Sequence, residues 1–262
     1  MKRVVYLDNN ATTCVAPEVL AGMLPYFSEW YGNPSSMHHF GGQVAKKLEE
    51  ARERVAALLG AEPTEIVFTG CGTESDSTAI RGILESYPEK RHLVTTRVEH
   101  PAVLTLGRYL AKRGYEVTEL SVDAQGMIDL DELRDVVSDH TAIVSLMWAN
   151  NETGTIFPVE EAAAIAKSVD AVFHTDAVQA AGKIPINMAQ SNMDLLAISG
   201  HKLHAPKGVG VLYVRRGTRL RPFLLGGHQE RGRRAGTENT ASIVALGKAC
   251  GIAHDQDRKS VV

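Results

Sequence analysis

The chain has 262 residues, 44% of them hydrophobic, and 28 Lys and Arg against 31 Asp and Glu give a net charge of -3. This length and apolar content suit one large domain, or one domain with part of a second. The balanced charge and the lack of a basic stretch exclude a nucleic-acid-binding class. No apolar run approaches a membrane span, and the N-terminus lacks the apolar region of a secretion signal, so we expect a cytoplasmic protein without a membrane partner.

The cysteines and histidines argue against a cross-linked or metal-bound protein. Cys14, Cys71 and Cys250 are widely spaced and form no CxxC pair, which predicts free thiols. The closely spaced histidines have no carboxylate or cysteine at ligand spacing. We therefore expect no metal site.

The first sixty residues are predicted to be mainly helical. A helix is expected after Pro17, and a long amphipathic helix is expected from about His38 to Leu59. Between them, Gly-Asn-Pro-Ser-Ser at residues 32–36 predicts an irregular segment.

From about residue 64 onward, short β-branched segments alternate with helical patterns, which is typical of a parallel sheet built from βαβ units. The expected strands are Glu65–Thr69, His92–Thr96, Glu116–Leu120, Ala142–Leu146, Ala171–His174, Leu195–Ser199 and Gly210–Val214. The expected helices between them are Thr73–Ser86, Ala102–Arg113, Leu130–Val137 and Val159–Ser168.

The two ends of this pattern carry further expectations. The loop with Pro206 and Gly208 is too short for a helical crossover, which predicts one antiparallel strand in a mostly parallel α/β sheet with helices on both faces. A helix is expected over Ala241–Ala253, with no further element from Asp255 to Val262. The chain is thus expected to stop short of a complete protein.

Asp176 and Lys202 each lie just after an expected strand, at the sheet edge where open α/β folds bind ligands. A carboxylate that keeps a ring nitrogen protonated and a lysine that binds an aldehyde are typical of a pyridoxal 5′-phosphate (PLP) site. Such a lysine needs a lowered pKa, which burial or a nearby cation provides. The alternatives are that Asp176 caps the segment from Ala177 onward and that Lys202 is a solvated surface charge.

A second group of residues is suited to an anion. The segment Thr69–Ser75 joins a strand to a helix and is rich in glycine and hydroxyl groups, as in helix N-termini that bind phosphate. Ser199 and His201 beside Lys202 are further candidates for phosphate contacts. The alternative is an ordinary capped helix start, and the segment lacks the ending of a Walker A motif.

Two further positions carry candidate polar groups. His100, before Pro101, is suited to stack on a flat ring and exchange protons near neutral pH, or simply to cap or pack at the turn. Asn150 and Asn151 are suited to donate amide bonds to ring or substrate oxygens, or to form a turn.

Seven motifs occur in order and together resemble the PLP-dependent cysteine desulfurases. The wording around Cys71–Thr78 and Gly226–Gly232 is most similar to the NifS branch of nitrogen-fixing bacteria. The resemblance runs from Tyr6 to about Ala249. The motifs are Tyr6–Thr13, Gly72–Ser75, Val98–Pro101, Asn150–Gly154, His174–Gln179, Ser199–Lys202 and Arg233–Asn239.

The resemblance implies roles for particular residues. Lys202 would form the Schiff base, Asp176 would bind the pyridine nitrogen, and His100 would stack on the ring and assist proton transfer. The remaining implied contacts are Gln179 and Asn151 near the phenolic oxygen, Gly72, Thr73, Ser199 and His201 at the phosphate, and Thr237 at the phosphate of the other subunit.

It also implies the fold and assembly of aspartate aminotransferase-like enzymes, the type I PLP fold. Residues 1–15 would belong to the small domain, residues 16–250 would form the large PLP-binding domain, and residues 251–262 would begin an incomplete C-terminal small domain. The protein would be a homodimer.

The implied reaction removes sulfur from L-cysteine, leaving L-alanine and a protein persulfide for an iron-sulfur scaffold, in a nitrogenase-related pathway. In this family the nucleophilic cysteine lies beyond the position of Val262, and none of the three cysteines here replaces it. The chain as given is therefore expected to bind PLP weakly and not to desulfurate cysteine. The alternatives are a non-catalytic PLP-binding or dimerising remnant, or a related enzyme such as a selenocysteine lyase or an aminotransferase.

Overall fold

The computed structural model describes residues 5–260, with side chains described through Asp255. Its centre is a seven-stranded sheet in the order β1-β7-β6-β5-β4-β2-β3. The strands are β1 (Ile66–Thr69), β2 (His92–Thr96), β3 (Glu116–Leu120), β4 (Thr141–Met147), β5 (Val172–Asp176), β6 (Leu195–Ser199) and β7 (Gly210–Val214).

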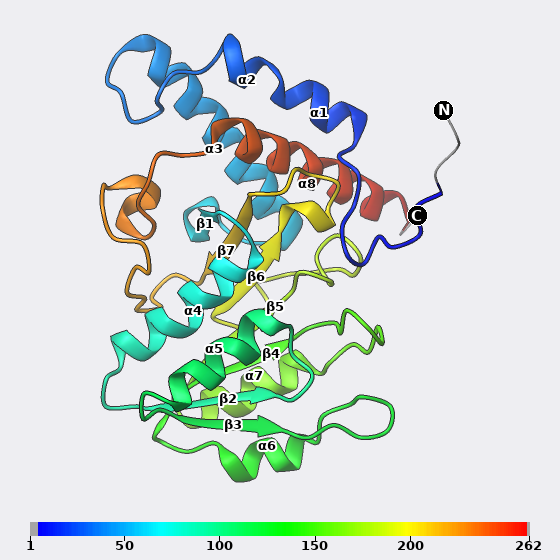
Figure 1. Ribbon diagram of the computed structural model, residues 1–262, viewed down its shortest axis with the longest axis vertical. Coiled ribbons are helices and arrows are strands. Elements are labelled where there is room, and N and C mark those ends of the chain that lie inside the picture. Colours follow the sequence, from blue (N-terminus) through cyan, green and yellow to red (C-terminus); the bar gives the residue numbers. More distant parts are fainter. Residues whose placement is uncertain (1–4, 261–262) are drawn as a thin grey trace.

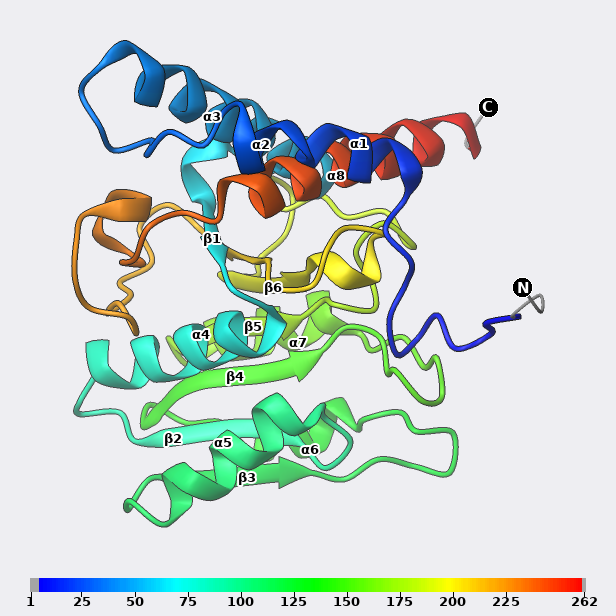
Figure 2. The same cartoon turned by 45° about the horizontal axis from the view of Figure 1, so that its top comes forward.

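The sheet is parallel apart from β7, which pairs antiparallel with both β6 and β1. This confirms the predicted α/β class and its one antiparallel strand. Because the other strands run the same way, their carboxyl ends meet at one edge of the sheet. Figure 2 shows β3 and β4 pointing toward the side where the N-terminal segment descends.

Helices cover both faces of the sheet. They are α1 (Pro17–Met23), α2 (Pro25–Ser28), α3 (His39–Leu59), α4 (Gly72–Ser86), α5 (Pro101–Ala111), α6 (Leu130–Val136), α7 (Val159–Ser168) and α8 (Thr240–Ser260). Short 3-10 turns occupy η1 (Pro63–Glu65), η2 (Gly200–Lys202) and η3 (Gln229–Gly232).

Apart from the edge strand β3, the strands are largely buried on both faces, so their alternate residues contribute to two separate cores. On one face α4 and α5 pack over a core that includes Val67, Leu212 and Val214. On the other face, Val211 and Tyr213 join the larger core beneath α1, α3, α7 and α8. Figure 1 shows α4 and α5 on one side of the strands, with α1, α3 and α8 gathered at one end.

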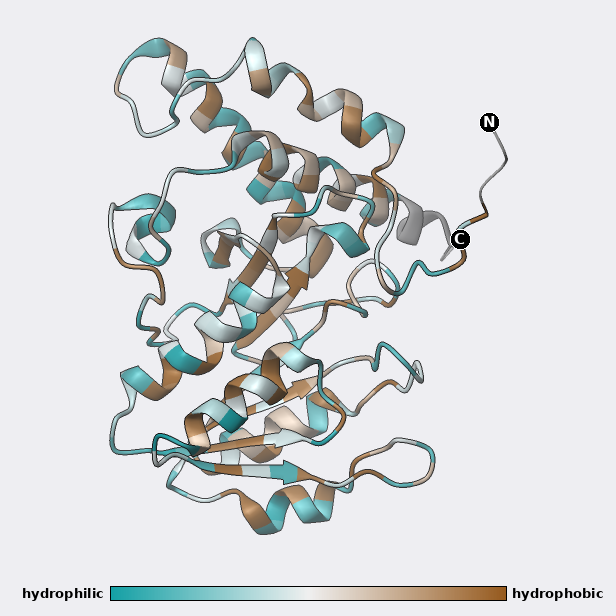
Figure 3. Cartoon of the chain, viewed as in Figure 1, coloured by the Kyte–Doolittle hydropathy of each residue, from teal (hydrophilic) through white to brown (hydrophobic). Residues whose placement is uncertain are grey.

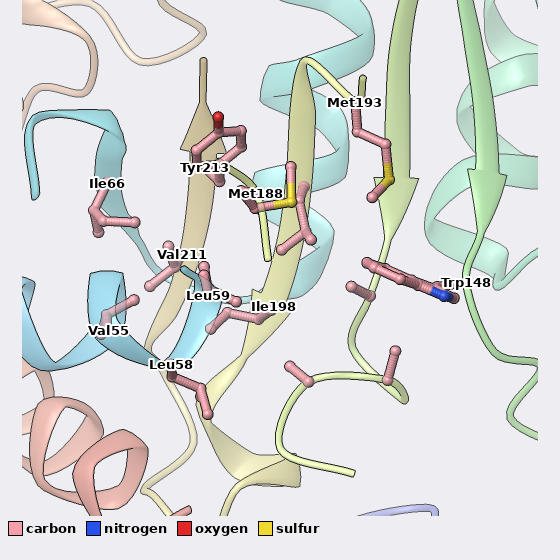
Figure 4. Packing of buried hydrophobic residues seen from close by; sticks show 14 of the residues in the cluster. Val55, Leu58, Leu59, Ile66, Trp148, Met188, Met193, Ile198, Val211 and Tyr213 are labelled. Atoms are coloured by element: carbon pink, nitrogen blue, oxygen red, sulfur yellow. The ribbon is translucent and has the colours of Figure 1, made fainter. Parts of the chain in front are cut away.

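The larger core is closely packed where α3 meets the sheet. Val55, Leu58 and Leu59 of α3 lie near Ile66 and Val211 in Figure 4. The helix begins at His39, after the His38 ring accepts a hydrogen bond from the Gly41 amide. It ends at Gly60, whose φ of 59° is left-handed and favours glycine.

Two surface regions differ in polarity: the edge strand β3 is charged, and the region around α1 and α2 exposes apolar side chains. The edge strand β3 carries exposed and half-buried charges and is pale or teal in Figure 3, whereas the inner strands are brown. Exposed apolar side chains gather on α1, α2 and the segment after them, namely Leu20, Leu24, Phe27, Trp30, Tyr31 and Met37. In the part of the chain that the structure describes, no helix is both long and apolar enough to cross a membrane.

Several expected boundaries shift in the structure. β5 continues to Asp176 because Thr175 and Asp176 pair with β4 and β6, although their polarity resembles that of a loop. The last helix continues to Ser260, so the expectation of no element after Asp255 was wrong for residues 255–260. Val261 and Val262 lie outside the described residues.

Candidate active site

A cavity of about 580 Å³ opens at the carboxyl edge of the sheet. It lies where β1, β2, β4, β5 and β6 end, as expected for a ligand site in an open α/β fold. All the predicted site residues except Thr237 line it: Gly72, Thr73, His100, Asn151, Asp176, Gln179, Ser199, His201 and Lys202.

Asp176 is fixed at the centre of this edge. It is the last residue of β5 and pairs with Met147 of β4 and Ala197 of β6. Its Oδ1 accepts a hydrogen bond from the Val178 amide at 2.9 Å, although the following residues form turns rather than a helix. Burial raises the pKa of Asp176, while the Val178 bond and the charges of His100 and Lys202 act in the opposite direction.

Lys202 faces the same cavity from η2, the turn after β6. Its Nζ donates hydrogen bonds to the backbone carbonyls of Asn10 and, at 3.0 Å, Ala11. Burial lowers the pKa of Lys202, and the carboxylates of Asp176 and Asp8 partly offset this. The amine is therefore more readily neutral than a solvated lysine, as a nucleophile or base requires.

The start of α4 supplies an anion-binding end to the cavity. Cys71 occupies the N-cap position, but its side chain makes no capping hydrogen bond. The backbone amides of the first turn therefore remain available to bind a ligand. The helix approaches β6 closely, since a Cβ at Gly72 would lie 3.0 Å from Val178 Cγ2 and 3.4 Å from Ser199 Cβ. Thr73 is exposed beside it.

The remaining predicted residues border the cavity with their own local bonds. His100 caps α5, its Nδ1 accepting from the Ala102 amide at 3.1 Å, so the capping alternative is observed alongside its place in the cavity. Asn151 Nδ2 donates to the adjacent Glu152, and Gln179 Nε2 donates to the Asn10 carbonyl at 3.0 Å.

Thr237 stands apart from the others. It is exposed and lines a separate cavity of about 170 Å³ together with Gly70, Gly208 and Arg234. The chain itself therefore does not bring Thr237 to the main cavity.

A strap over the cavity, defined as residues 8–13, was not assigned a role from the sequence. Thr13 donates to the His201 carbonyl through both its amide and its hydroxyl, at 3.0 and 2.9 Å. Thr12 Oγ1 lies 3.1 Å from His201 Nδ1. These bonds hold the strap on either side of Lys202, so the N-terminal segment forms part of the site wall.

Three buried polar residues behind the cavity were also missed. Asp76 of α4 and Glu99 after β2 are 1% and 4% exposed, and His174 of β5 is fully buried. Asp76 itself lines the cavity. Their signal in the sequence was faint, because a lone acid in a helix resembles a surface residue.

The three thiols differ in surroundings. Cys250 is fully buried, and burial raises the pKa of its thiol to about 12. Cys14 is exposed, and Cys71 is half-buried at the cavity wall. Among the described residues, no group of three or more His, Cys, Asp or Glu side chains is arranged to hold a metal ion.

Comparison with known proteins decides the family. The profile of the aminotransferase class-V family matches residues 5–261. The chain belongs to this family. The class-V aminotransferase family, which includes the cysteine desulfurases, depends on PLP.

Relatives of this class-V chain have been described in several bacteria. It is 63% identical over 246 residues to "Cysteine desulfurase" of Trichormus azollae, and 61% identical to "Cysteine desulfurase NifS" of Azotobacter vinelandii. Each match covers 94% of this chain but only 62% or 61% of the relative. The chain thus spans somewhat under two thirds of the length of these curated relatives.

Solved structures share the same fold. A "NifS-like protein" superposes with a TM-score of 0.94 at 44% identity, covering 98% of this chain and 71% of the other. "SspA in complex with cysteine" gives a TM-score of 0.91 at 40% identity, covering 94% of this chain and 72% of the other. These likenesses agree with the expected PLP fold.

The chemistry of the cavity fits PLP. A half-buried lysine with a lowered pKa and a buried carboxylate face one space. The start of α4 has no side-chain cap and lies close to Ser199, because Gly72 has no Cβ. Its free backbone amides can bind a phosphate. Asp76 Oδ1 is buried at the cavity wall without a hydrogen-bond partner, which indicates a polar site rather than a packed core.

Proposed function

We propose that this chain supplies the cofactor-binding part of a PLP-dependent cysteine desulfurase. The observation that carries the proposal is the placement of Lys202 and Asp176 on one cavity beside an uncapped helix N-terminus. The likeness to cysteine desulfurases, and to the protein SspA solved in complex with cysteine, supports L-cysteine as the substrate.

Bound PLP would supply an electron sink for negative charge that develops at the substrate α-carbon. Asp176 holds a proton at the ring nitrogen, since a carboxylate there stabilises the charged form of the ring. Lys202 would hold the cofactor through its aldehyde, and once the substrate amine has displaced it, the neutral Nζ would accept the substrate α-proton. Its lowered pKa favours both roles, because each needs a neutral amine.

The other predicted residues would bind and orient the cofactor. The first turn of α4, with Gly72 and Thr73, binds the phosphate together with Ser199 and His201. His100 would stack on the ring and assist proton transfer. Gln179 and Asn151 would hold the ring oxygen by exchanging their present hydrogen bonds, to the Asn10 carbonyl and to Glu152, for bonds to that oxygen.

The sulfur-accepting thiol is not one of the three cysteines of this chain. The buried Cys250 has a pKa raised to about 12, so it carries almost no thiolate near neutral pH. Cys71 lines the cavity at the start of α4, the end proposed to hold the phosphate, and Cys14 is not among the lining residues. The chain alone is therefore expected to bind the cofactor without sustained release of sulfide from cysteine.

We also infer a homodimer in the cytoplasm that passes sulfur to an iron-sulfur scaffold serving nitrogenase. The exposed position of Thr237, outside its own chain's cavity, supports a contact with the phosphate of the other subunit. The division into a segment of a small domain (residues 1–15), a large domain (16–250) and the start of a further small-domain segment (251–262) is part of the same proposal. The 61% identity to the Azotobacter vinelandii NifS protein supports the link to nitrogen fixation.

The visible absorption spectrum during PLP titration tests the proposal. We expect a saturable band in the unaltered chain and its loss in Lys202→Ala, with Lys207→Ala as a control for an exposed lysine nearby. An unchanged band in Lys202→Ala would refute the role of Lys202. Addition of L-cysteine, L-selenocysteine or L-alanine to the PLP-bound chain then compares substrates, and a spectral response absent with L-cysteine would contradict the substrate assignment.

A further inference from the structure

Three buried carboxylic acids from different elements lie close enough to influence one another's charge, two of them in the cavity lining and Glu99 outside that lining. Asp76 lies on α4, Glu99 lies between β2 and α5, and Asp176 ends β5. Their exposed fractions are 1%, 4% and 6%. We call them the acid cluster. Only Asp176 has a role in the proposed function, so the other two need an explanation.

The hydrogen bonds of the cluster leave oxygens unpaired. Glu99 Oε1 accepts from Thr96 Oγ1 at 3.0 Å and from the Met147 amide at 2.9 Å, but Oε2 is buried without a partner. Asp76 Oδ1 is likewise buried without one. An ionised carboxylate in such surroundings is unfavourable, whereas a protonated acid tolerates them far better.

The described side chains provide no cationic partner for these two acids. Among the ion pairs of residues 5–255, none joins a member of the acid cluster to a lysine or arginine. His174 Nε2 lies 3.6 Å from Asp76 Oδ1, and its Nδ1 lies 2.8 Å from Ser145 Oγ. Burial lowers the pKa of His174 to about 3, so the ring is neutral and the contact is not an ion pair.

The neighbouring charges affect the pKa values of the three acids differently. Burial, with the nearby charges of Asp176, Glu99 and Cys71, raises the pKa of Asp76 well above its ordinary value. Burial, together with Asp176, raises the pKa of Glu99 to about 8 despite its two hydrogen bonds. Favourable charges reach only Asp176, and they come from His100 and Lys202.

We propose that Asp76 and Glu99 are positioning residues, two neutral acids that confine the negative charge of the cluster to the carboxylate facing the ring nitrogen. This proposal rests on the proposed function, because it takes Asp176 as the partner of that nitrogen. The proposal predicts that proton binding and ligand binding are coupled. A cation bound at Asp176 offsets the negative charge that raises the pKa of Glu99, so it favours loss of the Glu99 proton. The affinity for a cationic ring therefore gains from rising pH until Glu99 is ionised.

Carbon-13 NMR of the chain labelled at glutamate carboxyl groups tests the neutral state without any cofactor. The Glu99 signal is identified by its loss in Glu99→Gln, and we expect its titration midpoint near pH 8. A midpoint near the ordinary value for glutamate would overturn the proposal. This measurement on the unaltered fold needs no active enzyme.

Binding of pyridoxine 5′-phosphate tests the link to Asp176, because this ligand has the ring and phosphate but no aldehyde for Lys202. Its dissociation constant is measured from about pH 6 to about pH 9 for the unaltered chain, Glu99→Gln and the exposed control Glu89→Gln. Titration of the ligand itself cancels in the ratio of affinities of two chains.

We expect equal affinity of the unaltered chain and Glu99→Gln near pH 6, and an advantage of roughly 3- to 10-fold for the unaltered chain at about pH 8. Asp76→Asn should bind normally near pH 7, because an amide replaces a neutral acid. A ratio that stays at one throughout, or a large loss in Asp76→Asn at neutral pH with the fold retained, would overturn the proposal. Failure of the unaltered chain to bind the ligand would instead refute the proposed function, while the NMR midpoint still reports the charge of Glu99.

Discussion

Two regions of the molecule bury charged groups, and they do so in opposite ways. Arg52 of α3 and Glu230 of η3 form a bidentate pair with two contacts of 2.8 Å. Glu230 also accepts from the Phe68 amide, and Arg52 donates to the Ile66 carbonyl. Both charges come from the chain, and the pair ties a distant loop to β1.

The acid cluster has only one sign of charge. Asp76 and Glu99 each keep a buried oxygen without a hydrogen-bond partner, and burial raises the pKa of all three acids. The comparison distinguishes two kinds of buried charge. Where the chain supplies both charges, the region is complete, and where it supplies only one sign, we expect a ligand to supply the other.

The largest expected effect breaks the complete pair. Arg52→Ala leaves Glu230 buried without its cation, and we expect a loss of about 3–5 kcal/mol in the free energy of unfolding. Urea unfolding measures it, with the exposed Arg54→Ala on the same helix as the control, expected within about 0.5 kcal/mol. Equal stability of Arg52→Ala and the unaltered chain would show that the pair is dispensable.

A smaller effect is expected at the incomplete region. Because the folded pKa of Glu99 is raised to about 8 from 4.5, the folded state holds more protons between these values. Its contribution to stability therefore falls as pH rises through this window, by an amount on the order of 2–4 kcal/mol. Urea unfolding at several pH values should show a flatter profile for Glu99→Gln. Stability profiles that run parallel in the two chains would contradict the raised pKa of Glu99. The lowered pKa of His174 makes stability change with pH in the opposite direction, but this contribution is the same in both chains.

The third effect concerns Asp176, the cluster member proposed to bind the ring nitrogen. Asp176→Asn removes the charged partner of the ring nitrogen and should weaken PLP binding by roughly 10- to 100-fold, the value of a charge-assisted hydrogen bond. Fluorescence titration of the cofactor measures it, and the exposed Asp135→Asn serves as the control. Undiminished affinity would remove Asp176 from the site.

The smallest effect lies at the strap. The charge of Asp8 raises the pKa of Lys202, so Asp8→Asn should lower that pKa further. An amine-reactive reagent labels the neutral form of Lys202. The rate of labelling of the peptide that contains Lys202, measured by mass spectrometry as a function of pH, gives the pKa of this amine. A pKa that rises or stays constant would contradict the placement of Asp8 near the amine.

Much of the fold was predictable because hydrophobic segments and their spacing carry it. The expected bounds His92–Thr96, Leu195–Ser199 and Gly210–Val214 match the strands, since their residues are apolar or β-branched and buried. The errors fall where tertiary pairing overrides local polarity. β5 recruits Asp176 because neighbouring strands offer backbone partners on both sides.

The site was predictable only in part. Asp176 and Lys202 follow strands, so topology brings them together. Asp76 lies on a helix face that only the packing of α4 against the sheet turns inward. Glu99 lies in the short connection between β2 and α5, directly before His100. Neither position has a local signature. The strap contacts depend on a fold-back of the N-terminus that no periodicity encodes.

The strap also sets an order of events during folding. Thr13 and His201 are 188 positions apart, so their bond forms only after the sheet has brought β6 into place. The wall of the cavity is thus completed by residues that are far apart in the chain. The sheet is therefore expected to form before the ligand pocket, which would make ligand capture a late step in folding.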